Sequence, residues 1–519
     1  LEAYQLRRLN QTLALIHRTR AATGGSPYMV RPPFGKTSEV LFGKTYKVLE
    51  TSEVSVETSE VSSTLAHIHR ARRHSVLSPH QTSEVSKFFG NLGGLYSSSL
   101  SPHHSVLKTL SDLKRLPYTS AEDIRRDPMA FWCVSQDRIA RIVTLTTSGT
   151  THAPKRIGFT EADLERTIDF FHYGMATLVR PGERVLILLP GDQPDGVGDL
   201  LVRALARMDV TGIAHGPVRD PEVTLAEIAD QEIDGIVGIP VQVLALARHP
   251  GGAEIGRGRV RTVLLTTDHV PRSIVTALET TWGCRVFQHY GMTEMGLGGG
   301  VECEAGSGYH LREADLLFEI IDPDRPDGPP PPEGEVGEVV FTTLTRTGMP
   351  LIRYRTGDLA AFIPDPCPCG SVLKRMTPVR RRRDNHAMAW LGSDRTLHLA
   401  DLDEALFAFP GVIDFEARVR PWREDRPAGA ELTLTLRIAP SHPPPDLGEV
   451  RRAVEVAAGG TANRWADTGD CPDNGRGDRD LRGFQSLGNL GGLQIRVADP
   501  AETWPAGSTG RAKRKLIHV

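Results

Sequence analysis

Helix-like segments alternate with short apolar runs in the middle of the chain, and this alternation limits the folds that the chain can adopt. The segments with helical periodicity are residues 161–177, 225–232 and 272–282. The apolar runs between and after them are residues 185–189, 233–239, 260–266 and 286–289. Buried strands separated by helices are typical of a parallel sheet with helices on its faces. The sequence therefore predicts an α/β fold.

The sequence that follows has a different texture, with apolar runs joined by turns rich in proline and glycine. The antiparallel strands predicted there are residues 316–321, 337–343 and 358–363. Beyond Arg383 the chain predicts a smaller unit, with a helix near residues 400–409 and a strand at residues 431–438. We therefore predict two domains, which cover residues 1–383 and 384–519.

Three stretches lie outside these patterns. Residues 1–28 carry an apolar stripe at helical spacing and predict a helix. Within residues 29–106 the tetrapeptide TSEV recurs at irregular spacings, which excludes a solenoid of fixed period. Its copies begin at Thr37, Thr51, Thr58 and Thr82. We therefore predict that residues 29–106 are a low-complexity or inserted segment, with a real accessory element as the alternative. The sequence of residues 459–494 is rich in Gly and Asp and predicts irregular structure.

Charge and cysteine content argue against several classes of protein. The chain has 61 Lys and Arg against 64 Asp and Glu, a net charge of −3, which argues against a dedicated nucleic-acid binder. No run approaches the roughly 20 apolar residues that span a bilayer. The segment LEAYQLRRLN lacks the apolar core of a secretory signal. Six Cys in 519 residues do not make a disulfide scaffold. We therefore expect a cytoplasmic protein without a nucleic-acid or membrane partner.

The sharpest chemical feature is the segment 145–155, LTTSGTTHAPK, which continues an apolar run. Its glycine lets backbone amides turn toward an anion, its hydroxyls add donors, and its lysine offers a positive charge to phosphate oxygens. The candidate phosphate-binding residues are Thr147, Ser148, Gly149, Thr150, Thr151 and Lys155. Their order does not match the P-loop of nucleoside triphosphatases. An exposed turn rich in Ser and Thr is the alternative.

Two further motifs follow, at residues 290–294 (YGMTE) and residues 354–358 (YRTGD). Each alone is an ordinary turn sequence. Together with segment 145–155, and in this order, they resemble the nucleotide-binding motifs of the adenylate-forming superfamily, which includes acyl-CoA synthetases, adenylation domains and luciferases. His152 stands where that superfamily usually has a glycine.

The resemblance implies a role for most residues of these motifs. It places the nucleotide against Tyr290, Gly291 and Met292, the α-phosphate on Thr293, Mg²⁺ on Glu294 and the two ribose hydroxyls on Asp358. The chemistry is consistent with these roles. A carboxylate that attacks the α-phosphorus approaches a polyanion, so a metal ion and hydrogen-bond donors must neutralise the charge.

Two short segments, residues 26–28 (SPY) and 116–119 (LPYT), resemble the N-terminal region of the phenylacetate-CoA ligase branch. The resemblance covers residues 1–28, residues 107–458 and the last dozen residues. It implies a large N-terminal domain of parallel-rich sheets and helices with a small β-barrel-like subdomain, and a small mobile α+β C-terminal domain. It also implies an AMP-forming ligase that uses ATP, Mg²⁺ and coenzyme A to convert an aryl carboxylic acid into a thioester.

Four potential zinc ligands follow the two motifs. Cys303 and His310 come after the first motif, and Cys367 and Cys369 come after the second. Three thiolates and one imidazole would complete a closed tetrahedral Zn²⁺ site, which would be structural and would tie the two motifs together. The phenylacetate-CoA ligase branch often has zinc ligands at matching places. Free thiols and a surface histidine are the alternative.

The last two candidates come from basic segments near the domain boundary and the end of the sequence. Residues 380–385 (RRRRDN) occupy the place of the family's GRxDD hinge. The resemblance implies that Arg382 contacts the ribose or the phosphates and that Asp384 is the hinge. The family's C-terminal lysine bridges the carboxylate and the α-phosphate, and Lys513 is the nearest match, with Lys515 second. Exposed basic runs are the alternative for both segments.

Three functions stay open on the sequence alone. The first is a carboxylate–CoA ligase, the second transfers the adenylated acid to another acceptor such as a carrier-protein thiol, and the third is a degenerate nucleotide-binding homologue without turnover. By family position the acyl pocket lies near residues 213–216, residues 238–241 and Tyr290, whose modest size suits a compact aryl acid. The sequence does not decide the oligomeric state, for which a homodimer is the commonest default.

Overall fold

A computed structural model describes residues 1–23, 107–145, 154–383, 388–390, 396–421, 430–459, 493–498 and 517–518. The chain divides into two compact units, Leu1–Tyr28 with Leu116–Val519, and Met29–Arg115. In the second unit the described residues begin at Leu107 and include the 3₁₀ helix η1 (Leu110–Arg115). The predicted inserted segment 29–106 lies outside the described residues.

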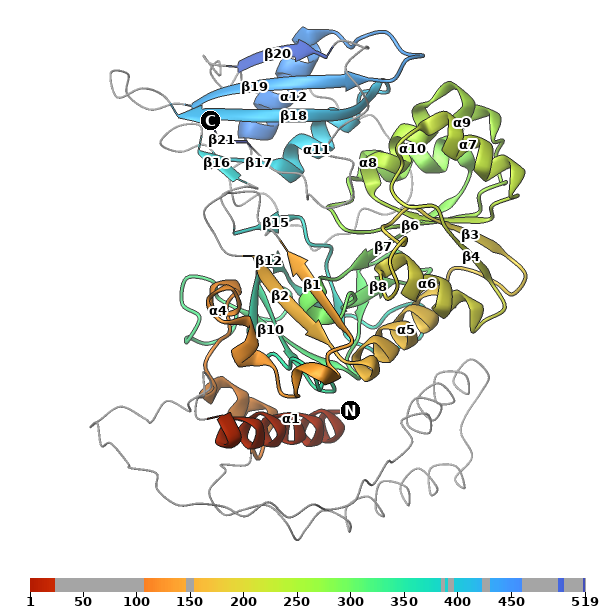
Figure 1. Ribbon diagram of the computed structural model, residues 1–519. Helices are drawn as coiled ribbons and strands as arrows, with labels where there is room; N and C mark the ends of the chain where they lie inside the picture. Colours follow the sequence, from red (N-terminus) through yellow and green to blue (C-terminus); the bar gives the residue numbers. More distant parts are fainter. Residues whose placement is uncertain are drawn as a thin grey trace. The chain divides into compact units, whose positions relative to one another are not determined.

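The core of the first unit is a nine-stranded sheet that contains the parallel strands expected from the sequence (Figure 1). Its parallel neighbours, in spatial order, are β4 (Thr211–Ala214), β3 (Arg184–Ile187), β5 (Gly235–Gly238), β6 (Thr262–Leu265) and β7 (Arg285–Tyr290). The chain runs from β3 outward to β4 and then returns to β5 on the other side, so the strand order reverses between β3 and β5. In open α/β sheets ligands bind beyond the carboxyl ends of the strands.

The helices of this region confirm the predicted alternation. They are α5 (Glu161–Met175), α6 (Val197–Ala206), α7 (Pro221–Asp230), α8 (Pro240–Arg248), α9 (Pro250–Glu254) and α10 (Arg272–Trp282). Local sequence explains their ends. The Thr160 side chain caps the first turn of α5 and the Asp163 side chain bonds back to the cap. Gly283, with φ of 66°, ends α10 in the left-handed region.

Beyond β7 the same sheet continues with antiparallel strands. These are β8 (Gly300–Glu302), β9 (Tyr309–Leu311), β14 (Arg375–Met376) and β13 (Phe362–Ile363). They are short, and β14 and β13 come from a part of the chain far beyond β9. The sheet therefore brings the segment after the second motif next to the segment after the first.

A second sheet is antiparallel, as the sequence predicts. Its strands, in order, are β10 (Leu316–Ile321), β11 (Gly337–Thr343), β12 (Tyr354–Ala360) and β15 (Arg381–Arg382). A separate hairpin is formed by β1 (Arg141–Leu145) and β2 (Lys155–Phe159). The expected strand 358–363 is wrong in its bounds, because β12 begins earlier and ends before β13. Closure of these strands into a barrel stays a prediction.

The C-terminal part forms a layer of strands and helices. Its sheet, in order, contains β20 (Leu493–Val497), β19 (Ala430–Ile438), β18 (Val412–Pro421) and β21 (Ile517–His518). Its other elements are α11 (Leu399–Phe407), α12 (Leu447–Gly459), β16 (Met388–Trp390) and β17 (Thr396–His398). Most of the irregular segment predicted at 459–494 lies outside the described residues. The domain boundary at residue 383 and the mobility of this layer stay predictions.

The N-terminal helix α1 (Glu2–Thr23) confirms the helix expected in residues 1–28. Leu9 and Ile16 on its apolar stripe are buried. The Gln5 side-chain amide donates to the carbonyl of Glu313 at 3.0 Å, and the Thr12 hydroxyl donates to the carbonyl of Leu344 at 2.9 Å. These contacts fix α1 against the second sheet. The remaining short helices are α4 (Ala121–Arg126), η2 (Pro128–Phe131) and η3 (Gln136–Arg138).

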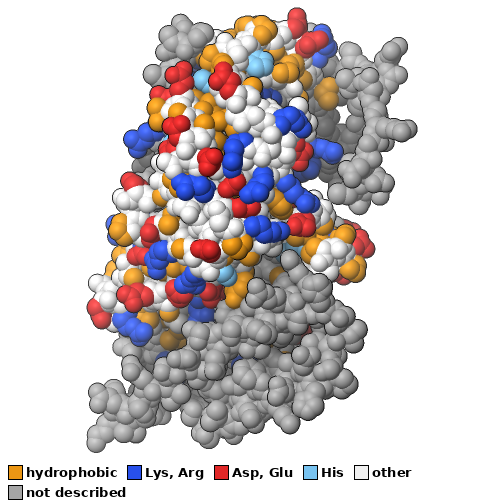
Figure 2. Space-filling model, turned by 90° about the vertical axis from the view of Figure 1, so that its right-hand side faces the viewer, with side chains coloured by type: hydrophobic (Ala, Val, Ile, Leu, Met, Phe, Trp, Pro, Cys, Tyr) orange, Lys and Arg blue, Asp and Glu red, His pale blue; other side chains and the backbone are white. Residues whose placement is uncertain are grey.

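The surface agrees with the near-neutral charge of the sequence. On the face drawn in Figure 2, basic side chains are interspersed with acidic ones among the coloured residues. Among the helices in the described ranges, none combines the length and the apolar character needed to cross a bilayer.

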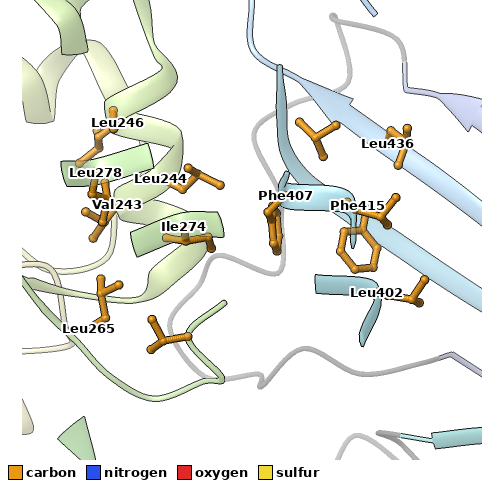
Figure 3. Packing of buried hydrophobic residues seen from close by; sticks show 14 of the residues in the cluster. Val243, Leu244, Leu246, Leu265, Ile274, Leu278, Leu402, Phe407, Phe415 and Leu436 are labelled. Carbon is orange, nitrogen blue, oxygen red and sulfur yellow. The ribbon is translucent and has the colours of Figure 1, made fainter. Parts of the chain in front are cut away.

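A buried apolar cluster joins the helices of the first sheet to the C-terminal layer (Figure 3). Leu244 of α8 and Ile274 of α10 belong to one side of this cluster, and Phe407 and Phe415 belong to the other. At its edge the guanidinium of Arg248 donates to the carbonyls of Phe407 at 2.7 Å, Phe409 at 3.0 Å and Val412. These include carbonyls at the C-terminal end of α11, which lack partners within the helix.

The variant Arg248→Met is expected to lower the free energy of unfolding by about 2–3 kcal/mol, because it removes three hydrogen bonds from a charged donor while it keeps an apolar side chain. Urea unfolding of the full chain measures this loss. Arg203→Met is the control, since Arg203 pairs with Asp195 and Asp199 at the surface and such pairs contribute about 0–1 kcal/mol. Equal losses for the two variants would contradict a special role for Arg248.

Candidate active site

The structure describes part of the predicted site. The predicted nucleotide and Mg²⁺ ligands within the described ranges are Lys155, Tyr290, Gly291, Met292, Thr293, Glu294, Asp358 and Arg382. Those outside the described residues are Thr147, Ser148, Gly149, Thr150, Thr151, Asp384 and Lys513. The geometry of the site therefore comes from the first group.

The first motif leaves the parallel sheet at the carboxyl end of β7. Tyr290 is the last residue of the strand, and η4 (Thr293–Met295) forms the turn that follows. Gly291 has no room for a side chain, because a Cβ there would lie 2.8 Å from the Cα of Gly298. Gly296 ends η4 with φ of 76°, in the left-handed region that favours glycine. This tight turn directs the acidic side chain of the motif into the protein.

Glu294 is that acidic residue, and three parts of the chain hold it in place. Its carboxylate pairs with the ammonium of Lys155 and accepts a hydrogen bond from the Tyr354 hydroxyl at 3.1 Å. Its backbone carbonyl accepts a hydrogen bond from Arg346 at 2.8 Å. Burial alone would raise the pKa of Glu294, but Lys155 and Tyr354 outweigh burial and hold that pKa below its ordinary value. The carboxylate is therefore ionised at neutral pH, as a metal ligand must be.

Asp358 lies on β12, in which Tyr354, Thr356 and Asp358 are buried. The pairing of β12 with β11 is irregular between Arg355 and Leu359, and Gly357 has φ of 75°, so the burial of these side chains rather than strict alternation places them toward the interior. The Asp358 carboxylate accepts a hydrogen bond from the Tyr290 hydroxyl at 3.0 Å, and it lies 3.0 Å from Nε of Arg382 on the adjacent strand β15. The structure thus brings Asp358 and Arg382 together, whereas their contacts with a ribose or a phosphate stay predictions.

The two tyrosines of the motifs donate to these acids. Burial and the nearby Asp358 raise the pKa of Tyr290, and burial and the nearby Glu294 raise the pKa of Tyr354. Both hydroxyls therefore keep their protons at neutral pH and serve as donors to the carboxylates.

Sequence reasoning missed Tyr354 and Arg346. Tyr354 stands inside the second motif and could have been noticed because it matches the tyrosine at the start of the first. Arg346 gave no comparable signal. Its guanidinium is buried, donates to the carbonyl of Gly158 at 3.0 Å as well as to Glu294, and lies 4.3 Å above the ring of Phe159. It therefore fixes strand β2 to the loop that carries Glu294.

The four predicted zinc ligands lie together at the antiparallel end of the first sheet. The ligand atoms of Cys303, His310, Cys367 and Cys369 are all within 4.8 Å of one another. Sγ of Cys303 lies 3.5 Å from Sγ of Cys367, and Sγ of Cys369 lies 3.4 Å from Nε2 of His310. Ligand atoms around a tetrahedral zinc ion, with bonds of about 2.0–2.3 Å, lie about 3.3–3.8 Å apart. The donor set therefore fits Zn²⁺, and two of its ligand pairs already have the separation of a tetrahedral site.

These contacts define what the site can do. Glu294 is an ionised, buried carboxylate that suits a hard cation such as Mg²⁺, while Asp358 can accept hydrogen bonds from two neighbouring hydroxyls. Lys155, the first residue of β2, pairs with Glu294 and offers a positive charge to an anion. The described part of the site therefore suits a ligand that contains a sugar, a metal ion and phosphates.

Comparison with known proteins agrees with this geometry. A family model described as AMP-binding enzyme matches residues 97–345. A phenylacetate-coenzyme A ligase of Thermus thermophilus is 32% identical to this chain over 313 residues, which are 59% of the chain and 68% of that protein. This chain belongs to the phenylacetate-CoA ligase branch of the adenylate-forming enzymes. Another phenylacetate-CoA ligase, from Escherichia coli, is 29% identical over 293 residues, which are 54% of this chain and 64% of that protein.

A solved structure supports the fold of the branch. A 2-hydroxyisobutyryl-CoA ligase in its postadenylation state matches with a TM-score of 0.60 and 18% identity, over 79% of this chain and 82% of that one. At this identity the likeness shows the fold alone. It agrees with the α/β class that the sequence predicts.

Proposed function

We propose that this chain is an AMP-forming carboxylate–CoA ligase. The observation that carries the proposal is the convergence of three distant segments: Lys155 contacts Glu294, Glu294 contacts Tyr354, and Tyr290 contacts Asp358. The relatives named above are phenylacetate-CoA ligases, which supports an aryl acid as the substrate.

The proposed reaction has two steps. In the first, a carboxylate oxygen attacks the α-phosphorus of ATP, the bond to the β-phosphate breaks, and pyrophosphate leaves with the electron pair. In the second, the coenzyme A thiolate attacks the acyl carbon, and AMP leaves with its oxygen. Both steps build negative charge next to phosphates, so catalysis rests on the groups that neutralise it.

The residues of the chain divide this work. Asp358 holds the ribose hydroxyls, Lys155 binds phosphate oxygens, and Thr293 donates to the α-phosphate. Glu294 would hold Mg²⁺, which would supply further positive charge for the phosphates. Three further residues have separate roles in the proposal: Arg382 lies near the ribose, Asp384 is the hinge, and Lys513 acts at the reacting carboxylate. The remaining phosphate ligands in the proposal are Thr147, Ser148, Gly149, Thr150 and Thr151.

Several finer points belong to the same proposal. A structural Zn²⁺ is held by Cys303, His310, Cys367 and Cys369, which is supported by their donor types, by their clustering and by two pairs at the separation of a tetrahedral site. The C-terminal layer is a mobile domain that turns between the two steps, which is the usual way for one site to serve two reactions. A cytoplasmic location and a homodimer stay predictions from the sequence.

The test is the release of pyrophosphate when the full chain is mixed with ATP, Mg²⁺ and a panel of aryl and alkyl acids. We expect release with at least one compact aryl acid, followed by AMP formation that requires coenzyme A. Pyrophosphate release without use of coenzyme A would favour another acyl acceptor. Folded protein that binds ATP but releases no pyrophosphate with any acid would favour a degenerate homologue.

A further inference from the structure

The two motifs of the site share one spacing. In each, a tyrosine stands four residues before an acid, Tyr290 before Glu294 and Tyr354 before Asp358. Each tyrosine bonds to the acid of the other motif. The hydroxyl of Tyr290 donates to Asp358 at 3.0 Å, and the hydroxyl of Tyr354 donates to Glu294 at 3.1 Å. The two hydrogen bonds therefore cross between a loop after β7 and the strand β12.

Packing holds each tyrosine ring in place. Tyr354 is 2% exposed, and its ring lies 5.3 Å from the ring of Phe341 on the adjacent strand β11. Tyr290 is 7% exposed, and its ring stacks on that of Tyr309 at 5.7 Å. Because neither ring has space to turn, each hydroxyl stays directed at its acid.

Each acid has a second partner, which is a cation on the more open side. Glu294 pairs with Lys155, and the side chains are 3% and 15% exposed respectively. Asp358 pairs with Arg382, and the side chains are 4% and 29% exposed. Long basic side chains that reach solvent can move to a phosphate, whereas buried tyrosines cannot. A ligand can therefore displace the cations and leave both tyrosine contacts intact.

We propose that Tyr290 and Tyr354 are positioning residues that form a reciprocal clasp. Tyr354 holds Glu294 at the place of the metal ion while Lys155 turns to the phosphates, and Tyr290 holds Asp358 at the place of the ribose while Arg382 moves aside. Because each hydrogen bond joins both motifs, the clasp also fixes the spacing between the metal ion and the ribose. This inference rests on the proposed function of the site.

The clasp predicts a crossed pattern of binding effects, which calorimetry on the full chain can measure with two probes. The first is AMP in the absence of metal, which reports on Asp358. The second is α,β-methylene-ATP, an analogue that cannot release pyrophosphate, bound with and without Mg²⁺. The factor by which Mg²⁺ strengthens its binding reports on Glu294.

The variant Tyr354→Phe keeps the ring and removes the hydroxyl. We expect the Mg²⁺ factor to fall about tenfold, the effect of one hydrogen bond to a charged group, while AMP affinity stays within about twofold. Tyr290→Phe should do the reverse, with AMP affinity about tenfold weaker and the Mg²⁺ factor unchanged. Glu294→Gln and Asp358→Asn give the upper limit of each effect.

A matched control is Tyr118→Phe, because the hydroxyl of Tyr118 donates to the carbonyl of Pro326 at 2.6 Å and not to either acid. Both binding values should stay unchanged in this variant. The clasp is wrong if Tyr290→Phe lowers only the Mg²⁺ factor and Tyr354→Phe lowers only the AMP affinity. It is also wrong if both variants lower the AMP affinity and the Mg²⁺ factor alike. If wild-type protein binds AMP and the analogue but the tyrosine variants bind as wild type, the clasp alone fails. If wild-type protein binds neither probe, the proposed function fails with it.

Discussion

Glu294→Gln is expected to lower kcat/KM for pyrophosphate formation by about 100–1,000-fold, the usual cost of removing a group that stabilises transition-state charge. The amide keeps the size of the side chain and can still accept the hydrogen bond of Tyr354. It removes the negative charge that attracts Mg²⁺, so the phosphates keep their charge as the substrate carboxylate approaches. Exchange of labelled pyrophosphate into ATP, measured at saturating acid, gives the rate directly.

The ion pair between Glu294 and Lys155 sharpens this prediction. In the variant the ammonium of Lys155 loses its partner and stays available to phosphate, so the affinity for ATP without metal should not fall. Glu304→Gln is the control, because it removes the same charge from a side chain that is 59% exposed. A loss of less than tenfold in Glu294→Gln, or an equal loss in the control, would show that Glu294 is not the metal ligand.

The fold was predictable where periodicity is strong. The spacing of apolar residues in 272–282 and 316–321 predicts α10 and β10 with the bounds that the structure has. Strand β12 shows why other bounds were missed. The expected strand included Asp358 but not Tyr354 and Thr356, because Arg355, Thr356 and Gly357 interrupt the apolar pattern before it. Asp358 is tolerated there because Tyr290 and Arg382 satisfy it, and these are contacts between distant segments.

The site was predictable where a motif has a chemical meaning of its own. Glu294, Asp358 and the Cys and His residues could be chosen from residue type and order alone. The partner of each acid could not, because the distance between Tyr354 and Glu294 depends on how β12 pairs with β11 and on the turn after β7. The role of Arg346 could not be predicted from the sequence for the same reason, since it depends on backbone carbonyls at Gly158 and Glu294 that only the fold brings together.

Cys367→Ser is expected to cause the largest loss of stability among these variants. Wild-type protein should contain about one Zn²⁺ per chain by metal analysis, and a structural zinc site contributes an apparent ~10–16 kcal/mol of binding free energy in small zinc-finger peptides. A domain is stable by only about 5–15 kcal/mol, so even a partial loss of this binding should lower the unfolding midpoint by about 10 °C or more. Thermal unfolding with and without a chelator measures the effect.

The control is Cys133→Ser, which introduces the same polar atom at a buried cysteine that is not one of the four candidate ligands. It should keep the zinc content and lose less stability. Wild-type protein without zinc after purification in its presence, or a chelator without effect on the midpoint, would contradict a structural zinc ion.

The position of the four ligands explains why this loss should reach the nucleotide site. Cys303 follows β8, and the first motif leaves β7, the adjacent strand of the same sheet. Cys367 follows β13, which Ala361 alone separates from β12 and so from Asp358. Arg375 also joins these segments, because it donates to the carbonyls of Ser307 and Asp365 at 2.7 Å, but without the metal ion four partly buried ligand side chains remain between the segments without a shared partner. Chelation should therefore weaken AMP binding as well as stability, whereas Arg248→Met should lower stability alone.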